Sequence, residues 1–213
     1  MLLPHWLNLL APLLTTAVGI FTITNPIGNI PVFLALATGK RRDDLAMARA
    51  CAVTVAVTLL LATWFGNGIL QLFGISQGAF QAAGGLILVL IGLSMLRSKP
   101  SDMHRTSGNE DSSGAGSIAG VVPLGIPMMA GPGTISLVIG SPLGRTANGR
   151  LDLTMIVLVV SGLVFVIFAL SDWLNSRLSS ASLEILTKVM GLLLTSIAVQ
   201  MLFSGVQTEF FPS

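Results

Sequence analysis

The chain has 213 residues, of which 53% are hydrophobic and only 9% are charged, and its mean hydropathy is +0.86. A water-soluble domain of this length needs roughly a quarter of its residues charged to cover its surface, so this composition excludes an ordinary soluble globular protein. It predicts an integral membrane protein whose apolar exterior faces lipid. The formal net charge of +2 is too small to indicate a nucleic-acid partner, and we expect none.

Membrane-crossing helices are expected wherever about 20 consecutive residues are mainly apolar. The first such stretch begins near the N-terminus. No Lys or Arg precedes it, and residues 1–14 contain no small-x-small cleavage site, so we interpret it as part of a span and not as a removable signal peptide. Six spans are predicted: residues 9–38, 46–65, 78–96, 117–140, 151–172 and 183–204. The expected fold is therefore an all-α membrane protein with six transmembrane helices.

The first predicted span is too long for a straight rod. Thirty residues of helix reach roughly 45 Å, which exceeds the hydrocarbon thickness. The segment TITNPIGNIP interrupts it with Pro26, Gly28 and Pro31, and proline removes a backbone donor while glycine permits unusual backbone angles. We expect a break or a re-entrant turn at this point. The fourth predicted span has the same character, in the segment VPLGIPMMAGPGTIS.

The basic residues predict the orientation in the membrane. With six spans, the loops near 39–45, 97–116 and 173–182 lie on one side. That side carries Lys40, Arg41, Arg42, Arg49, Arg97, Lys99, Arg105, Arg177 and Lys188, whereas the opposite side carries Arg145 and Arg150. Because basic loops stay in the cytoplasm, both termini are expected to face outward, which means the periplasm in a bacterium.

The two halves of the chain align without a gap when one is shifted by 106 residues. The shift places Pro26 on Pro132, Gly85 on Gly191, and other apolar positions on one another. We therefore predict a first three-helix repeat over 1–96, a flexible cytoplasmic linker over 97–116 and a second three-helix repeat over 117–213, all within one membrane domain. Because each half has an odd number of spans, the second half is inverted, as in many secondary transporters.

Polar residues and backbone breaks inside the membrane predict the binding site. Unpaired amides and carbonyls are costly in hydrocarbon, and they are tolerated where they line a cavity or meet a ligand. Helix N-termini suit an anionic group and freed carbonyls suit a cation, so a zwitterion would fit both. The candidate substrate-binding residues are Thr24, Asn25, Pro26, Gly28, Asn29, Gly131, Pro132, Gly133 and Thr134. The alternative interpretation is that both segments are kinks at helix contacts.

Gln200 in the sixth span is a further candidate for lining the site, since a glutamine is costly to bury in a membrane. Gln81, Ser94, Thr195 and Ser196 also lie inside predicted spans, and Ser and Thr there usually bond their own helix or a neighbouring one. No Asp or Glu lies in the middle of a predicted span, which argues against a proton-coupled pump.

Signatures of catalysis and of cofactor binding are missing from the sequence. It has no Gly-x-Ser-x-Gly, no Walker A motif and no His-Glu pair, and both histidines, His5 and His104, fall outside the spans. Cys51 is the single cysteine, which excludes an intrachain disulfide and a multi-cysteine metal site. We expect a protein that is not an enzyme and that has neither a metal nor another cofactor.

Several motifs resemble the MarC family of bacterial inner-membrane proteins. They are NPIGNIPVF at 25–33, VPLGIPMMAGPGTIS at 122–136, the FGIS…AGG run over 73–85 and KVMGLLL at 188–194. The resemblance implies a six-span protein of the plasma membrane, and some related proteins are described as transporters of small neutral amino acids. It makes Asn25, Pro26, Gly28, Pro31, Pro123, Pro127, Gly131, Pro132 and Gly133 the family-motif positions.

The function that these features favour is secondary transport or export of a small polar solute by alternating access, with neutral amino acids as one candidate substrate. A passive channel and a non-transporting membrane scaffold are the alternatives. The expected partners are the lipid bilayer and the small polar solute. Gly84, Gly85 and Gly92 permit close helix packing, either within the monomer or in a homo-oligomer, and spacing alone does not distinguish the two.

Overall fold

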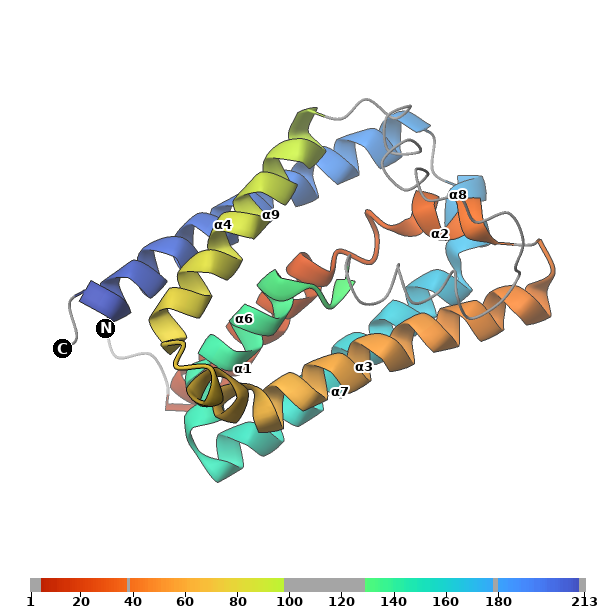
Figure 1. Ribbon diagram of the computed structural model, residues 1–213. Coiled ribbons are helices and arrows are strands. Elements are labelled where there is room, and N and C mark those ends of the chain that lie inside the picture. Colours follow the sequence, from red (N-terminus) through yellow and green to blue (C-terminus); the bar gives the residue numbers. More distant parts are fainter. Residues whose placement is uncertain (1–4, 38, 98–128, 178–179, 211–213) are drawn as a thin grey trace.

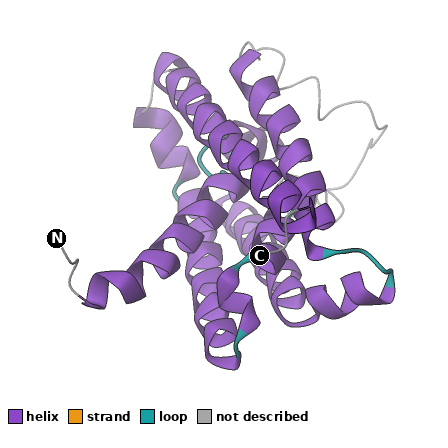
Figure 2. Ribbon diagram, turned by 90° about the vertical axis from the view of Figure 1, so that its left-hand side faces the viewer, coloured by secondary structure: helices purple, strands orange, loops and turns teal. Residues whose placement is uncertain are grey.

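The computed structural model describes residues 5–37, 39–97, 129–177 and 180–210, and within these ranges all regular structure is helical (Figures 1 and 2). The helices are α1 (His5–Thr24), α2 (Ile30–Leu36), α3 (Arg41–Leu72), α4 (Gln77–Arg97), α6 (Pro132–Gly140), the 3-10 helix η3 (Pro142–Arg145), α7 (Ala147–Ala169), α8 (Ser171–Arg177) and α9 (Ser180–Phe210). The predicted linker over 97–116 lies outside the described residues except for Arg97, the last residue of α4.

Four of these helices are long and apolar enough to cross a membrane: α3, α4, α7 and the part of α9 over Ile185–Phe210. Their outer faces carry large exposed hydrophobic side chains, such as Leu61, Leu90 and Val159, which suit contact with lipid. The protein is therefore an integral, multi-pass membrane protein. These four helices match the second, third, fifth and sixth predicted spans.

The first and fourth predicted spans are not single crossing helices among the described residues. The first forms α1, of which Ala11–Thr24 is apolar, followed by a break and the short α2. The fourth contributes α6, a helix of 9 residues, while positions 117–128 lie outside the described residues. Both breaks were predicted from Pro and Gly, and the structure has α1 ending at Thr24 and α6 beginning at Pro132. Six complete spans remain a prediction.

Helix α3 extends beyond its predicted span at both ends. It begins at Arg41 because Asp43 and Asp44 in its first turn interact favourably with the N-terminal end of the helix dipole. It continues to Leu72, where Gly74, at φ +65°, reverses the chain. The amide of Ile75 then donates to the carbonyl of Leu70 at 2.9 Å and satisfies one of the last free carbonyls.

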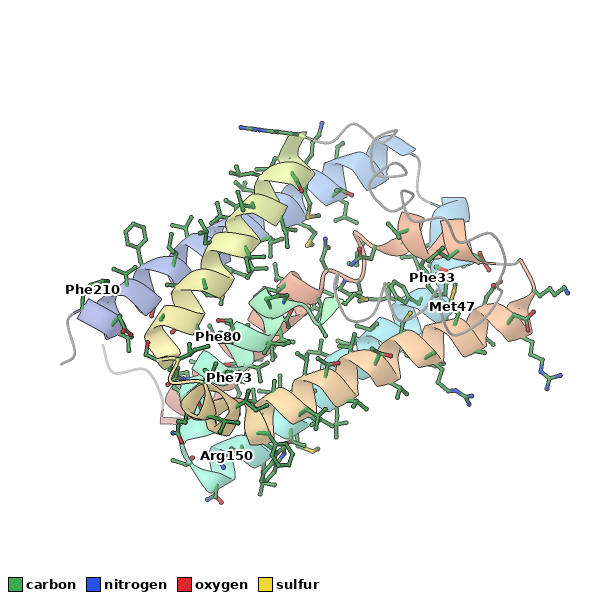
Figure 3. The ribbon with its side chains drawn as sticks, in the orientation of Figure 1. Phe33, Met47, Phe73, Phe80, Arg150 and Phe210 are labelled. Carbon is green, nitrogen blue, oxygen red and sulfur yellow. The ribbon has the colours of Figure 1, made fainter. Side chains whose placement is uncertain are left out.

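Two pairs of long helices form the frame of the molecule, α4 with α9 and α3 with α7 (Figure 1). Between the pairs lie α6, which contacts both α4 and α3, and α1, which contacts α7, α6 and α9. The core between α3 and α7 includes Leu59, Leu153 and Val157, all fully buried. At one end of this core Phe33 of α2 stacks on Phe168 of α7 with ring centroids 4.5 Å apart, and Met47 packs nearby (Figure 3).

Helices α4 and α9 run antiparallel and approach so closely that glycine is required where they meet. A Cβ atom on Gly85 would lie 2.7 Å from the backbone nitrogen of Leu202, and one on Gly205 would lie 2.5 Å from that of Ala82. Gly92 packs likewise on Gly191 of α9, whereas Gly84 faces Ser136 of α6. The glycines of α4 thus serve packing within the monomer, the first of the two uses that the sequence allows.

Candidate functional site

The first break is built around Asn25. Its φ angle is 42°, and it is the single non-glycine residue with positive φ among the described residues. Asparagine tolerates this region better than most residues because its short amide can bond the local backbone. Here the amide of Gly28 donates to Asn25 Oδ1 at 3.2 Å, and the amide of Asn29 donates to the Asn25 carbonyl at 3.2 Å. Pro26 itself has no amide hydrogen to donate.

The Asn29 side chain bonds two backbone carbonyls at the break. Its Nδ2 donates to the carbonyl of Thr24 at 3.3 Å and to that of Asn25 at 3.0 Å. The Thr24 hydroxyl donates to the Phe21 carbonyl at 3.0 Å. Thr24, Asn25 and Asn29 are all buried. In this conformation the polar groups predicted to meet a solute therefore bond the backbone of the break itself, and their binding of a solute stays a prediction.

The second break is closed in a comparable way. Gly131 is extended and precedes α6, whose first residue is Pro132. The Thr134 hydroxyl donates back across the break to the Met129 carbonyl at 2.9 Å, and the Ser136 hydroxyl donates to the Phe80 carbonyl of α4 at 2.9 Å. Thr134 and Ser136 are both buried. Pro123 and Pro127 lie outside the described residues.

Residues of both breaks contact the same helix, α4. Asn25 Nδ2 lies 3.6 Å from the sulfur of Met95, and Gly133 packs directly against the side chain of Leu88. Two helical turns separate Leu88 from Met95, which corresponds to roughly 10 Å along the axis. Residues from the two halves of the chain thus contact neighbouring turns of α4.

Gln200 does not lie at the breaks; it lines a cavity of about 470 Å³ between α1, α4, α6 and α9. Its polar lining consists of Thr15 of α1, Gln81 of α4, and Gln200 and Ser204 of α9, and its apolar lining includes Val18, Leu137 and Met201. Gln81 is half-buried and Gln200 is exposed. Among the described residues, neither glutamine amide has a hydrogen-bond partner, so this hollow suits water or a polar solute.

The cavity and the first break are joined by an apolar cluster. Met201 lines the cavity and packs in one buried group with Ile23, Leu88 and Met95, and Met95 in turn contacts Asn25. The cluster thus touches the cavity through Met201 and the break through Met95.

Thr15, Gln81 and Ser204 were not among the predicted site residues. Gln81 carried the same signal as Gln200, an amide within an apolar span, and could have been included on that ground. Thr15 and Ser204 gave no separable signal, because Ser and Thr usually bond their own helix. Among the described residues, no group of three or more His, Cys, Asp or Glu could hold a metal ion, and the absence of a cofactor stays a prediction.

The comparisons with known proteins agree with the motifs. The family described as MarC family integral membrane protein matches residues 10–210. The chain is 35% identical over 197 residues to a UPF0056 membrane protein of Pyrococcus abyssi, covering 91% of this chain and 93% of the relative. It is 33% identical to UPF0056 membrane protein YvbG of Bacillus subtilis, with the same shares, and 29% identical to UPF0056 membrane protein YhcE of Escherichia coli, with 91% of each chain covered.

No solved structure matches this chain significantly. The relatives come from bacteria and from an archaeon, and the match extends over nearly the whole of each chain. The chain belongs to the MarC family of integral membrane proteins.

Proposed function

We propose that this protein is a secondary transporter of a small polar solute without net charge, and that it works by alternating access. The observation that carries the proposal is the 470 Å³ cavity lined by Thr15, Gln81, Gln200 and Ser204 within otherwise apolar helices. Neutral donors and acceptors line this cavity and no Asp, Glu, Lys, Arg or His does so among the described residues, which favours a neutral or zwitterionic solute. A neutral amino acid is one candidate.

The apolar cluster around Met95 and Met201 is the proposed barrier between the cavity and the breaks. A polar solute held by Gln81 and Gln200 meets apolar side chains in that direction, so passage requires the cluster to separate. The breaks beside it can supply that movement, because a chain interrupted at Asn25–Asn29 can bend where a continuous helix cannot.

The proposal includes an inverted repeat, and two observations support it. Helix α3 begins at Arg41 and α7 begins at Ala147, positions related by the 106-residue shift. The close contacts between α4 and α9 are also paired: Gly85 meets Ala198 and Leu202, and Gly191 meets the equivalent positions Gly92 and Leu96. A two-fold relation between the halves would produce this pattern. We extend the proposal to six spans in a plasma membrane, with both termini outside.

The test is counterflow of labelled small neutral amino acids into proteoliposomes. Wild type is compared with the double variant Gln81→Leu, Gln200→Leu, and with Ser196→Ala as a matched control on α9. Ser196 is exposed, bonds the Leu192 carbonyl and does not line the cavity. We expect saturable exchange in wild type and control and at least roughly tenfold slower exchange in the double variant, the factor expected from losing about one net hydrogen bond.

Other outcomes would favour other functions. Equal exchange by the double variant would remove the cavity as the binding site. Flux that never saturates and shows no counterflow would favour a passive channel. No flux of any small neutral solute through well-folded protein would favour a membrane scaffold.

A further inference from the structure

A second hollow lies on the outer surface of the α3–α7 pair, away from the transport cavity. It has a volume of about 300 Å³ and shares no lining residue with that cavity. Its walls are Arg49, Ala52, Val53 and Ala56 of α3 and Ser161, Gly162 and Phe165 of α7. Val53 in its wall and neighbouring side chains on these helices, such as Val57 and Leu158, are large, apolar and exposed, so the groove opens sideways toward lipid.

Arg49 stands at one end of this groove with its charge uncompensated. It is exposed, and within the described part of the chain it makes no hydrogen bond or ion pair. It lies two turns into α3, or roughly 12 Å from Arg41 along the axis. Because α3 has 32 residues and spans roughly 48 Å, its first turns reach past the hydrocarbon layer, and Arg49 falls near the depth of the lipid headgroups.

The rest of the groove is shaped by small residues. Ala52, Ala56 and Gly162 leave a furrow, and a Cβ atom on Gly162 would meet nothing within 4 Å. Ser161 also lines it, is 5% exposed, and has a hydroxyl without a hydrogen-bond partner among the described residues. Because this hydroxyl oxygen is buried away from the groove surface, the furrow that a ligand would meet is apolar.

We propose that this groove binds an anionic phospholipid. The phosphate pairs with Arg49, and an acyl chain lies in the furrow along Ala52, Ala56 and Gly162. The apolar walls select a lipid over a water-soluble anion. An anionic headgroup is favoured over a zwitterionic one because, among the described residues, no acidic side chain lines the groove to pair with an ammonium group.

The test is native mass spectrometry of the full-length protein with phosphatidylglycerol or phosphatidylethanolamine of identical acyl chains. Arg49→Gln removes the charge, and Arg42→Gln is the matched control, an exposed arginine in the first turn of the same helix outside the groove. We expect wild type and control to prefer phosphatidylglycerol. Arg49→Gln should lose roughly tenfold in affinity for that lipid, as expected for one charge-assisted pair, and should no longer discriminate between the two headgroups.

Filling the furrow tests the acyl chain separately. Gly162→Leu, and Ala56→Leu from the opposite wall should the first not fold, are expected to weaken both lipids while Arg49 remains. Equal losses from Arg49→Gln and Arg42→Gln would overturn the site in favour of general surface charge. Undiminished binding by a folded furrow variant would overturn it too, as would displacement of the lipid by millimolar inorganic phosphate alone.

Discussion

Asn25 and Asn29 together stabilise the first break, and both are buried in an integral membrane protein. Asn25 supplies a positive φ and an acceptor for the Gly28 amide, and the Asn29 side chain donates to the carbonyls of Thr24 and Asn25. Water can replace such bonds in a loop, but not in hydrocarbon. The sequence predicted the break from Pro26 and Gly28, and correctly so. That both asparagines bond the break itself could not be predicted, because it depends on the direction of each side chain.

Removing the Asn29 amide should therefore destabilise the protein independently of any solute. In Asn29→Ala the buried Thr24 carbonyl loses its side-chain donor, at a cost of about 1–3 kcal/mol, whereas the Asn25 carbonyl keeps its bond from the backbone amide of residue 29. We expect a lower thermal midpoint for the variant in detergent, measured without added solute. Ser196→Ala, which alters an exposed hydroxyl, is the control. An unchanged midpoint for Asn29→Ala would mean that the break does not depend on this amide.

At the scale of the element, hydropathy located the centres of the helices and missed their ends. The predicted 78–96 matches α4 closely, whereas α3 exceeds the predicted 46–65 at both ends. Its ends depend on acidic residues at the helix start and on the positive φ of Gly74, and neither feature is apolar. The prediction of 151–172 as one span missed the division into α7 and α8 at Leu170.

The contact between α4 and α9 yields a prediction at this scale. In Gly85→Ala the new methyl group would press on the backbone of Leu202 and Ala198, and neither can move as a side chain does. We expect a loss of about 1–3 kcal/mol, the range for overpacking, observed as a lower thermal midpoint. Gly68→Ala is the matched control in α3, because nothing lies within 4 Å of its added Cβ. Equal stability of the two variants would contradict the close approach.

At the scale of the whole molecule, equivalent helices in the two halves of the chain make different contacts. Ser136 of α6 bonds Phe80 of α4, and the equivalent pair under the 106-residue shift is Ile30 of α2 and Leu186 of α9. Yet α2 packs against α7 and α8. In transporters with inverted repeats, exchanging the conformations of the halves generates the state open to the other side. The sequence could suggest the repeat, but not which half adopts which conformation.

If the proposed inverted repeats exchange conformations in this protein, a new contact is expected in the alternative state. The pair Ile30→Cys, Leu186→Cys should become crosslinkable as the protein cycles, whereas Phe80→Cys, Ser136→Cys should crosslink in the conformation described here. The measurement is disulfide formation in membranes with and without transported solute. A solute-dependent shift from the second pair to the first is expected. If the first pair never crosslinks under turnover, the movement is not an exchange of repeats.

Burial of Cys51 has a practical consequence for following such movements. This cysteine is fully enclosed between α3 and its neighbours, and it is the only one in the chain. A membrane-impermeant thiol reagent should therefore find no target on the natural protein. Each residue that lines the cavity can be replaced by cysteine one at a time. The labelling rate of each introduced thiol, measured from each side of the membrane, would show in which conformation water reaches that position.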